Sequence, residues 1–180
     1  MLSRRRRSPD HHTGATDRQL RALIDENADA IFRMAYSVLR DRGLAEDVVQ
    51  DTLITAWRRL PDWRGEGTLR GWVLSIAHNT SVSYLRRIRD QATEPSRLPE
   101  RTAPDNVERD VDGRADLEAL TAALANLDET SRSIVVLRDI EGLTYQQIGE
   151  VLDLPLPTIK TRLLRARREL QRVIREGALT

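Results

Sequence analysis

The sequence has no cysteine, few aromatic residues and no long apolar run. Without cysteine there can be no disulfide, thiolate metal site or cysteine nucleophile. No apolar stretch approaches the roughly 18–20 residues that a membrane-spanning helix needs. Of three histidines, two lie close to the N-terminus, so neither a catalytic triad nor a histidine-rich metal site can be built. A glycine-rich phosphate loop is also missing.

These absences exclude several classes of protein. We expect no enzymatic activity, no cofactor, no metal site, no small-molecule substrate and no membrane-spanning segment. A chain without cysteine is compatible with a reducing compartment, and we expect a cytoplasmic protein. The first residues are basic but lack the apolar stretch of a signal peptide. Residues 1–16, which include Arg4 to Arg7, are therefore interpreted as a disordered basic tail.

Charged residues make up 32% of the chain and aromatic residues only 4%, a composition that favours helices with long solvated faces. The net charge is only +1, so any surface that binds nucleic acid must come from local clustering of cations. Apolar residues at helical spacing predict helices over about 20–39, 44–60 and 69–89. Gly43 is the expected stop between the first two, and Pro61 the end of the second.

Helical periodicity stops between Asp90 and Gly113, where three prolines and almost no large apolar residues occur. This composition is typical of a linker and marks a domain boundary. Helical spacing returns from Leu117, and Asp128 or Thr130 can cap the helix that contains Ile134 and Leu137. The sequence thus predicts an all-α fold of two small helical domains, 17–90 and 114–176, joined by a flexible linker over 91–113.

The last part of the chain has the pattern of a helix-turn-helix. Thr144 and Gln147 form a predicted capping box for a helix over 145–152. Pro155 then disfavours helix, while Pro157 is tolerated in the first turn of a second helix that runs to about Arg175. That second helix is strongly basic, which suits a helix in the DNA major groove. The alternative is a helical hairpin whose arginines are only solvated.

Two segments together resemble one known family. The stretch GLTYQQIGEVLDLPLPTIKTRLLRARREL is similar to the C-terminal helix-turn-helix of extracytoplasmic-function (ECF) sigma factors, the promoter-specificity subunits of bacterial RNA polymerase. The stretch AEDVVQDTLITAWRRLPDWRGEGTLRGWVLSIAHNTSVSYLRR resembles their second conserved region, which binds core polymerase and melts the promoter. The resemblance covers about Asp17 to Arg175, with the linker in the expected place.

The resemblance implies roles for residues of the N-terminal domain. The acidic helix would dock on the clamp helices of the largest polymerase subunit through Asp47, Gln50 and Asp51. Asn79 stands where the family places an amide near a flipped base of the minus-10 element. The remaining minus-10 contacts that we expect are from a loop and from the end of the third helix: Trp63, Arg64, Arg86, Arg87 and Arg89.

In the C-terminal domain, the resemblance implies recognition of the minus-35 element in the major groove. Base contacts are expected on the early, outward face of the second helix, and phosphate contacts around it. The expected base contacts are Lys160, Thr161, Leu164 and Arg165, and the expected phosphate contacts are Thr158, Arg162, Arg167 and Arg168. Pro157 departs from the family pattern and removes a backbone N–H that could bind a phosphate. Asp153 also replaces a glycine, and can take the left-handed conformation.

The implied partners are core RNA polymerase, promoter DNA in double- and single-stranded form, and an anti-sigma factor. The alternative function is that of a two-domain helix-turn-helix regulator of the LuxR type, which would bind duplex DNA without binding core polymerase as a sigma subunit. Such a regulator has no need of an acidic docking helix followed by a tryptophan-containing loop and a basic helix.

Overall fold

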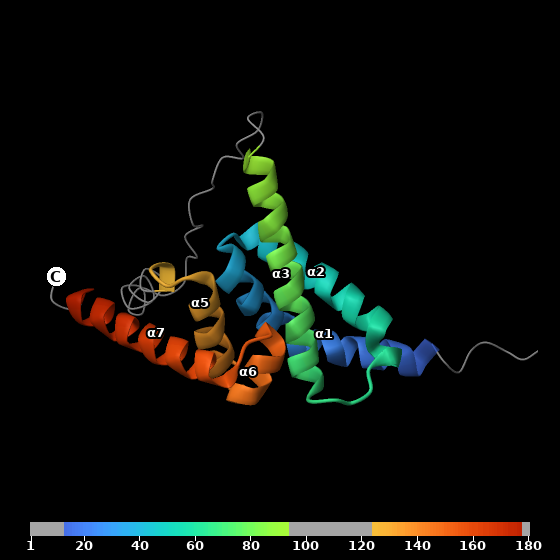
Figure 1. Ribbon diagram of the computed structural model, residues 1–180. Helices are drawn as coiled ribbons and strands as arrows, with labels where there is room; N and C mark the ends of the chain where they lie inside the picture. The colour runs from blue at the N-terminus through green and yellow to red at the C-terminus, as the bar shows by residue number, and fades with distance from the viewer. Residues whose placement is uncertain (1–12, 94–123, 178–180) are drawn as a thin grey trace, which may run out of the picture.

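The computed structural model describes residues 13–93 and 124–177, and this part of the chain is built from helices without strands (Figure 1). The helices of the N-terminal domain are α1 (Thr13–Leu39), α2 (Arg42–Arg59) and α3 (Leu69–Thr93), with the short 3-10 turn η1 (Leu60–Asp62) after α2. Those of the C-terminal domain are α5 (Glu129–Val135), the π-helical turn η2 (Val136–Ile140), α6 (Tyr145–Leu152) and α7 (Leu156–Gly177). The predicted all-α class is confirmed.

The break between α1 and α2 does not lie at Gly43. Arg40 has a left-handed backbone with φ of 56°, and α1 ends just before it. Asp41 then caps α2, since its side chain accepts a hydrogen bond of 2.9 Å from the Leu44 N–H. Gly43 consequently lies inside the first turn of α2. The prediction was wrong because the capping power of Asp41 outweighs the helix-breaking tendency of a glycine two residues later.

Two strong local signals fix the C-terminal helices where the sequence predicts them. Asp128 is the N-cap of α5 and accepts a hydrogen bond of 3.0 Å from the Ser131 N–H. Thr144 caps α6, which spans the predicted residues 145–152. The prolines allow α7 to start at Leu156, one residue before the predicted position. The starts of α5 and α6 were therefore predictable, because the capping residue of each was recognised in the sequence.

One large apolar cluster runs through both domains, and a smaller one lies between α1 and α2. Ile31, Met34 and Leu74 of the N-terminal domain belong to the same buried cluster as Ile134 and Ile148 of the C-terminal domain. The contacts between domains are made by α3 with α6 and by α1 with α5 and η2. In Figure 1, α5 and α6 accordingly lie beside α1 and α3. The two domains thus form one packed body.

The predicted domain limits lie partly beyond the described residues. The basic tail falls largely within 1–12 and the linker mostly within 94–123, both outside the part that the structure describes. Within that part, α1 already begins at Thr13 and α3 continues to Thr93. The limits 17–90 and 114–176 stay predictions.

Candidate nucleic-acid and polymerase interfaces

The turn between α6 and α7 is tight, and its sequence explains why. Asp153 takes the left-handed conformation with φ of 53° and ψ of 50°, as expected for the family's glycine position. The Leu154 N–H then donates to the Gly149 carbonyl at 3.1 Å. A Cβ atom on Gly149 would lie only 3.0 Å from the Leu154 carbonyl oxygen. The turn therefore depends on a glycine inside α6, and it fixes the angle at which α7 leaves.

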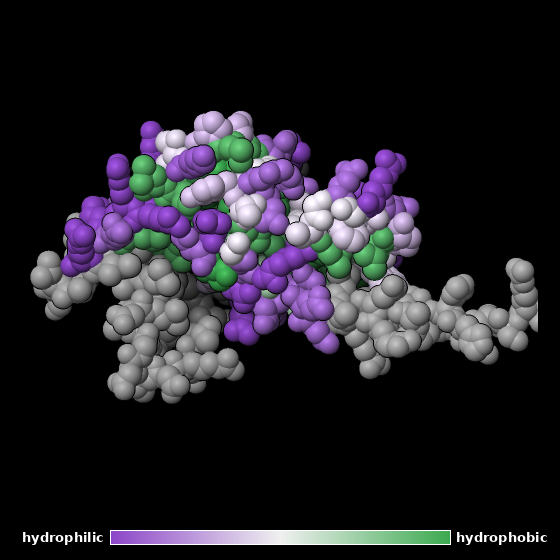
Figure 2. All heavy atoms as spheres, turned by 90° about the horizontal axis from the view of Figure 1, so that it is seen from below, coloured by the Kyte–Doolittle hydropathy of each residue, from purple (hydrophilic) through white to green (hydrophobic). Residues whose placement is uncertain are grey.

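Helix α7 divides into a buried and an exposed face. Ile159, Leu163 and Ala166 are buried against the core. The predicted DNA contacts lie away from that face. Lys160, Thr161, Leu164, Arg165, Arg167 and Arg168 are exposed, and Thr158 and Arg162 are half-buried. Hydrophilic side chains gather along the side of the molecule where α7 runs (Figure 2). The structure thus brings the predicted minus-35 residues together on one helix.

The first turn of α7 offers little backbone for an anion. Pro157 has no N–H, and the N–H groups of Thr158 and Ile159 both donate to the Pro155 carbonyl, at 3.0 and 3.2 Å. Leu156 is the first residue of α7, so its N–H precedes Pro157 and is not one of the two N–H groups bonded to Pro155. Phosphate contacts near this end of the helix would consequently rest mainly on side chains rather than on the helix N-terminus.

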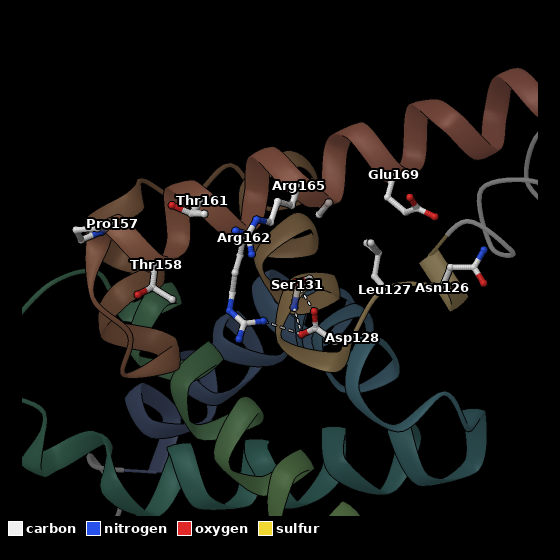
Figure 3. A pocket seen from close by; sticks show the side chains of 11 residues that line it. Asn126, Leu127, Asp128, Ser131, Pro157, Thr158, Thr161, Arg162, Arg165 and Glu169 are labelled. Atoms are coloured by element: carbon white, nitrogen blue, oxygen red, sulfur yellow. Dashed lines mark hydrogen bonds and ion pairs between the residues drawn. The ribbon is translucent and has the colours of Figure 1, made fainter.

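A hollow of about 620 Å³ lies between α7 and the start of α5 (Figure 3). Thr161 and Arg165 line it from α7, while Asn126, Leu127 and Asp128 line it from the opposite side. Arg162 reaches across and pairs with Asp128 at 3.0 Å. Burial raises the pKa of Asp128, but the hydrogen bonds from Ser131 and the charge of Arg162 outweigh burial, so its pKa lies below the ordinary value. Asp128 is therefore held in its charged form.

Carboxylates also pair with two further predicted DNA contacts. Arg167 forms a two-pronged ion pair with Asp139, and Arg89 lies 3.6 Å from Glu129. Sequence reasoning missed these carboxylates because each lies 28 or more residues from its arginine along the chain. No local sequence pattern indicates an ion pair between residues so far apart along the chain.

The predicted polymerase contacts form one exposed stripe on α2. Asp47, Gln50 and Asp51 are all exposed, and Ile54, one turn further on, is 49% exposed. The Tyr84 hydroxyl donates to Asp51 at 2.7 Å, which raises the pKa of Tyr84. This contact fixes one end of the acidic surface against α3.

The predicted minus-10 residues are only partly brought together. Asn79 and Arg86 are exposed and lie seven residues apart on α3, and so share a face of that helix. Arg87 instead lies over the Tyr84 ring, 5.8 Å from its centre, on the side of the acidic α2 stripe. The structure thus separates Arg87 from Asn79.

The two tryptophans meet at the start of α3. The Trp63 and Trp72 rings are 6.2 Å apart with an angle of 31° between them, and both side chains are half-buried. The Trp63 indole Nε1 is buried without a hydrogen-bond partner. Arg64 next to it is exposed. Trp72 lies seven residues before Asn79, so it continues the same face of α3.

Among residues 13–93 and 124–177, no three or more His, Asp or Glu side chains are grouped so that they could hold a metal ion. Within these ranges, no helix has the length and apolar character that crossing a lipid bilayer demands.

Both domains match models of known protein families. Residues 23–91 match "Sigma-70 region 2", and residues 117–170 match "Sigma-70, region 4". Among curated proteins, the chain is 30% identical to the RNA polymerase sigma factor YlaC of Bacillus subtilis over 89% of this chain and 92% of that protein. It is 36% identical to the ECF RNA polymerase sigma factor SigE of Mycolicibacterium smegmatis over 83% of this chain, but spans only 59% of that relative's length.

Solved structures agree with these matches over both domains. The sigma factor RpoE from Bartonella quintana, in complex with the anti-sigma factor NepR, matches with a TM-score of 0.70 and 26% identity, over 89% of this chain and 98% of that one. CnrH, in complex with the cytosolic domain of CnrY, matches with a TM-score of 0.65 and 25% identity, over 89% and 90% of the two chains. The LuxR-type alternative finds no support among these matches. The chain belongs to the ECF sigma factors, the family of subunits that direct bacterial RNA polymerase to promoters.

Proposed function

We propose that this chain binds core RNA polymerase, directs it to promoters with a specific minus-35 element and helps to open the minus-10 element. The proposal rests on one observation: a chain of this family presents an acidic surface and a basic surface together. The exposed acidic stripe of α2 offers carboxylates to a basic partner, and the exposed face of α7 offers cations to DNA. A regulator that binds duplex DNA alone has no use for the first surface.

The minus-35 contact is proposed for the outward face of α7. Seven cations and two glutamates lie within this helix, so it has a strong local positive charge despite the chain's net charge of +1. Arg165 and Lys160 can donate to guanine acceptors, while the exposed Leu164 suits a thymine methyl group. Arg162, Arg167 and Arg168 are proposed to contact phosphates.

The minus-10 contact is proposed for the face of α3 that carries Asn79 and Arg86, together with the loop that holds Trp63 and Arg64. An amide can both donate to and accept from a base edge, and aromatic rings can stack on unpaired bases. Arg89 is proposed as a backbone contact, while Arg87 is better placed to support the polymerase-binding surface through Tyr84.

Run-off transcription tests the proposed function. Purified chain and core polymerase should together produce transcripts from a subset of a promoter library, whereas core alone should not. Asp47→Asn combined with Asp51→Asn should lower core binding in a pull-down, with Glu46→Gln on the same helix as a control. A wild-type chain that binds duplex DNA but not core polymerase would overturn the proposal.

No catalytic step is ascribed to this chain, because the chemistry belongs to the polymerase. A cytoplasmic location follows from that partner. The matched RpoE and CnrH structures are complexes with NepR and with CnrY, and we propose that an anti-sigma factor likewise binds this chain. Co-purification with an affinity-tagged chain from its native host would identify such a partner. The same experiment with Leu164→Asp tests whether the exposed face of α7 takes part in the contact.

A further inference from the structure

A second hollow, of about 150 Å³, lies where α1 faces α5 and η2, and is called the α1–α5 hollow below. Phe32 and Tyr36 of α1 line one side of it, and their rings are stacked at 6.0 Å with an angle of 12° between them. The buried Val136 and the exposed Ile140 line it from η2. The lining is thus mainly apolar, and the volume is that of a cavity that accepts one benzene ring.

Three arginines also line the α1–α5 hollow, and only one of them pairs with a carboxylate. Arg33 lies 2.6 Å from Glu141, which also pairs with Arg70 of α3. Among the described residues, no carboxylate pairs with Arg40 or with Arg132. The positive charge beside the hollow is therefore incompletely matched.

Arg132 reaches from α5 to α1, yet part of its guanidinium group is left over. Its Nε donates to the Ser37 carbonyl at 2.8 Å, and its Nη1 donates to the Leu127 carbonyl. Its Nη2 has no hydrogen-bond partner within the part of the chain that the structure describes. Burial lowers the pKa of Arg132, and the charge of Arg40 lowers it further, while nearby carboxylates oppose this by less. An anion between the two arginines would relieve their repulsion.

Arg40 is held beside the hollow by an unusual backbone. It follows the last residue of α1 and takes the left-handed conformation with φ of 56°, which is uncommon for an arginine. Its N–H donates to the Tyr36 carbonyl at 3.0 Å, which fixes the turn. Its side chain is half-buried and lines the hollow. The turn therefore keeps a cation without a carboxylate partner next to an apolar, ring-sized space.

An aromatic carboxylate matches both properties of the α1–α5 hollow. Its ring fits the volume and can contact the stacked rings of α1, while its carboxylate can accept hydrogen bonds from Arg40 and Arg132. An inorganic anion would leave the apolar lining uncovered, and an uncharged ring would leave the arginines unmatched. None of the described residues that line the hollow has a carboxylate, thiol or imidazole group, so the molecule would be bound without being converted.

We propose that the α1–α5 hollow is a binding site for a small aromatic carboxylate, with the ring on the apolar lining and the carboxylate on Arg40 and Arg132. The site goes beyond the proposed function and does not depend on it, because its geometry involves neither DNA nor polymerase.

A matched pair of probes tests the site in the full chain: para-fluorophenylacetate and its uncharged counterpart of nearly the same shape, para-fluorophenylacetamide. In a titration followed by fluorine NMR, the acid should reach saturation with a Kd of about 1 mM or below. The amide should bind at least about tenfold more weakly, since it offers no charge to the arginines. Absence of saturation by the acid, or equal affinity of acid and amide, would overturn the proposal.

Three variants locate the binding. Arg40→Gln should weaken binding of the acid at least about tenfold and leave the amide unchanged. Ile140→Ala shortens the apolar lining and should weaken both probes by about threefold. Arg58→Gln is the matched control, because it removes the same charge from an exposed residue of α2, outside the hollow, and should bind the acid as the wild type does. An equal loss in Arg40→Gln and Arg58→Gln, at unchanged helix content by circular dichroism, would overturn the site.

Thermal unfolding gives an independent measure. A ligand that binds only the folded chain raises its unfolding temperature, so the Tm of the wild type should rise with acid concentration above the Kd. At the same concentrations Arg40→Gln should show a clearly smaller rise. A rise of equal size with sodium acetate would count against an aromatic site and overturn the proposal. Failure of run-off transcription would overturn the proposed function alone, since these binding results are obtained without DNA or polymerase.

Discussion

Three arginines proposed to contact promoter phosphates are each paired with a carboxylate of the same chain: Arg89 with Glu129, Arg162 with Asp128 and Arg167 with Asp139. Exposed ion pairs of this kind contribute at most about 1 kcal/mol. A phosphate can therefore replace the carboxylate at little cost. Meanwhile the carboxylate keeps the arginine side chain extended along the surface.

Asp139→Asn tests this exchange for one arginine. Arg167 would lose its competitor, so minus-35 duplex should bind more tightly at low salt, with the slope of log affinity against log salt steeper by about one. Binding titrations at several salt concentrations measure both quantities. Asp153→Asn is a matched control because it removes the same charge from an exposed aspartate that tolerates asparagine in the left-handed conformation. An equal gain in the control would show that only net charge matters.

Arg165 differs from these three arginines because, within the part that the structure describes, it makes no ion pair. It is exposed and lines the hollow beside α7. Arg165→Ala should weaken binding to the cognate minus-35 duplex by about 1–3 kcal/mol and relax base preference at one position. Fluorescence anisotropy with cognate and scrambled duplexes measures the effect. An equal loss on both duplexes would make Arg165 a phosphate contact.

His78 makes stability depend on pH. It is half-buried on α3, and burial lowers its pKa below the ordinary value of 6.5. Its Nδ1 has no hydrogen-bond partner. The folded chain binds this proton less well than the unfolded chain, so the free energy of unfolding should fall as pH drops below about 6.5. Urea unfolding at pH 7.5 and 5.5 should show a smaller fall in His78→Gln than in the wild type. Identical falls would contradict this origin.

At the scale of elements, the α6–α7 turn leaves little room for a larger side chain at Gly149. Gly149→Ala would place a Cβ atom 3.0 Å from the Leu154 backbone oxygen, which cannot move without the turn. The usual gain of alanine over glycine in a helix should be reversed, with a loss of about 1–2 kcal/mol of unfolding free energy.

Gly43→Ala is the matched control for this substitution. Gly43 lies in the first turn of α2, where the nearest neighbour of a new Cβ atom would be an Asp41 oxygen at an ordinary 3.5 Å. It should stabilise the chain by about 0.5–1 kcal/mol. Chemical denaturation followed by circular dichroism measures both variants. The explanation of the turn fails if Gly149→Ala also stabilises.

Helix starts with local signals could be predicted from the sequence, whereas contacts between residues far apart in the chain could not. The start of α6 was predictable because Thr144 and Gln147 signal it within four residues. The acidic stripe of α2 and the basic face of α7 also follow from helical spacing. The pairs of Glu141 with Arg33 and Arg70 span 108 and 71 residues, and only tertiary packing creates them. Arg40 as a helix stop was missed because a left-handed arginine is uncommon.

At the scale of the whole molecule, one core serves two domains. Ile31 and Leu74 share a buried cluster with Ile134 and Ile148, so each domain covers apolar surface of the other. Small domains of this size have little stability to spare. Each domain therefore depends on the other in this arrangement.

This shared core predicts a single cooperative unfolding transition. The calorimetric and van't Hoff enthalpies of the wild type should agree, as they do when no intermediate is populated. The Arg33→Gln and Arg70→Gln double variant should show a ratio above one or two resolved transitions, because its domains unfold separately. Two transitions in the wild type would contradict a shared core. Glu169→Gln should unfold as the wild type does.

The π-helical turn η2 makes the contact between the two domains tolerant of a change in chain length. In this turn the Glu141 N–H bonds to Val136, five residues back, in place of the four of a regular helix. The turn therefore contains one residue more than an α-helix would use. The loss of one residue within η2 would leave a regular α-helical turn of four residues, which keeps Glu141 on nearly the same side of the helix. The contact of Glu141 with both arginines should therefore tolerate a change of chain length at this one place.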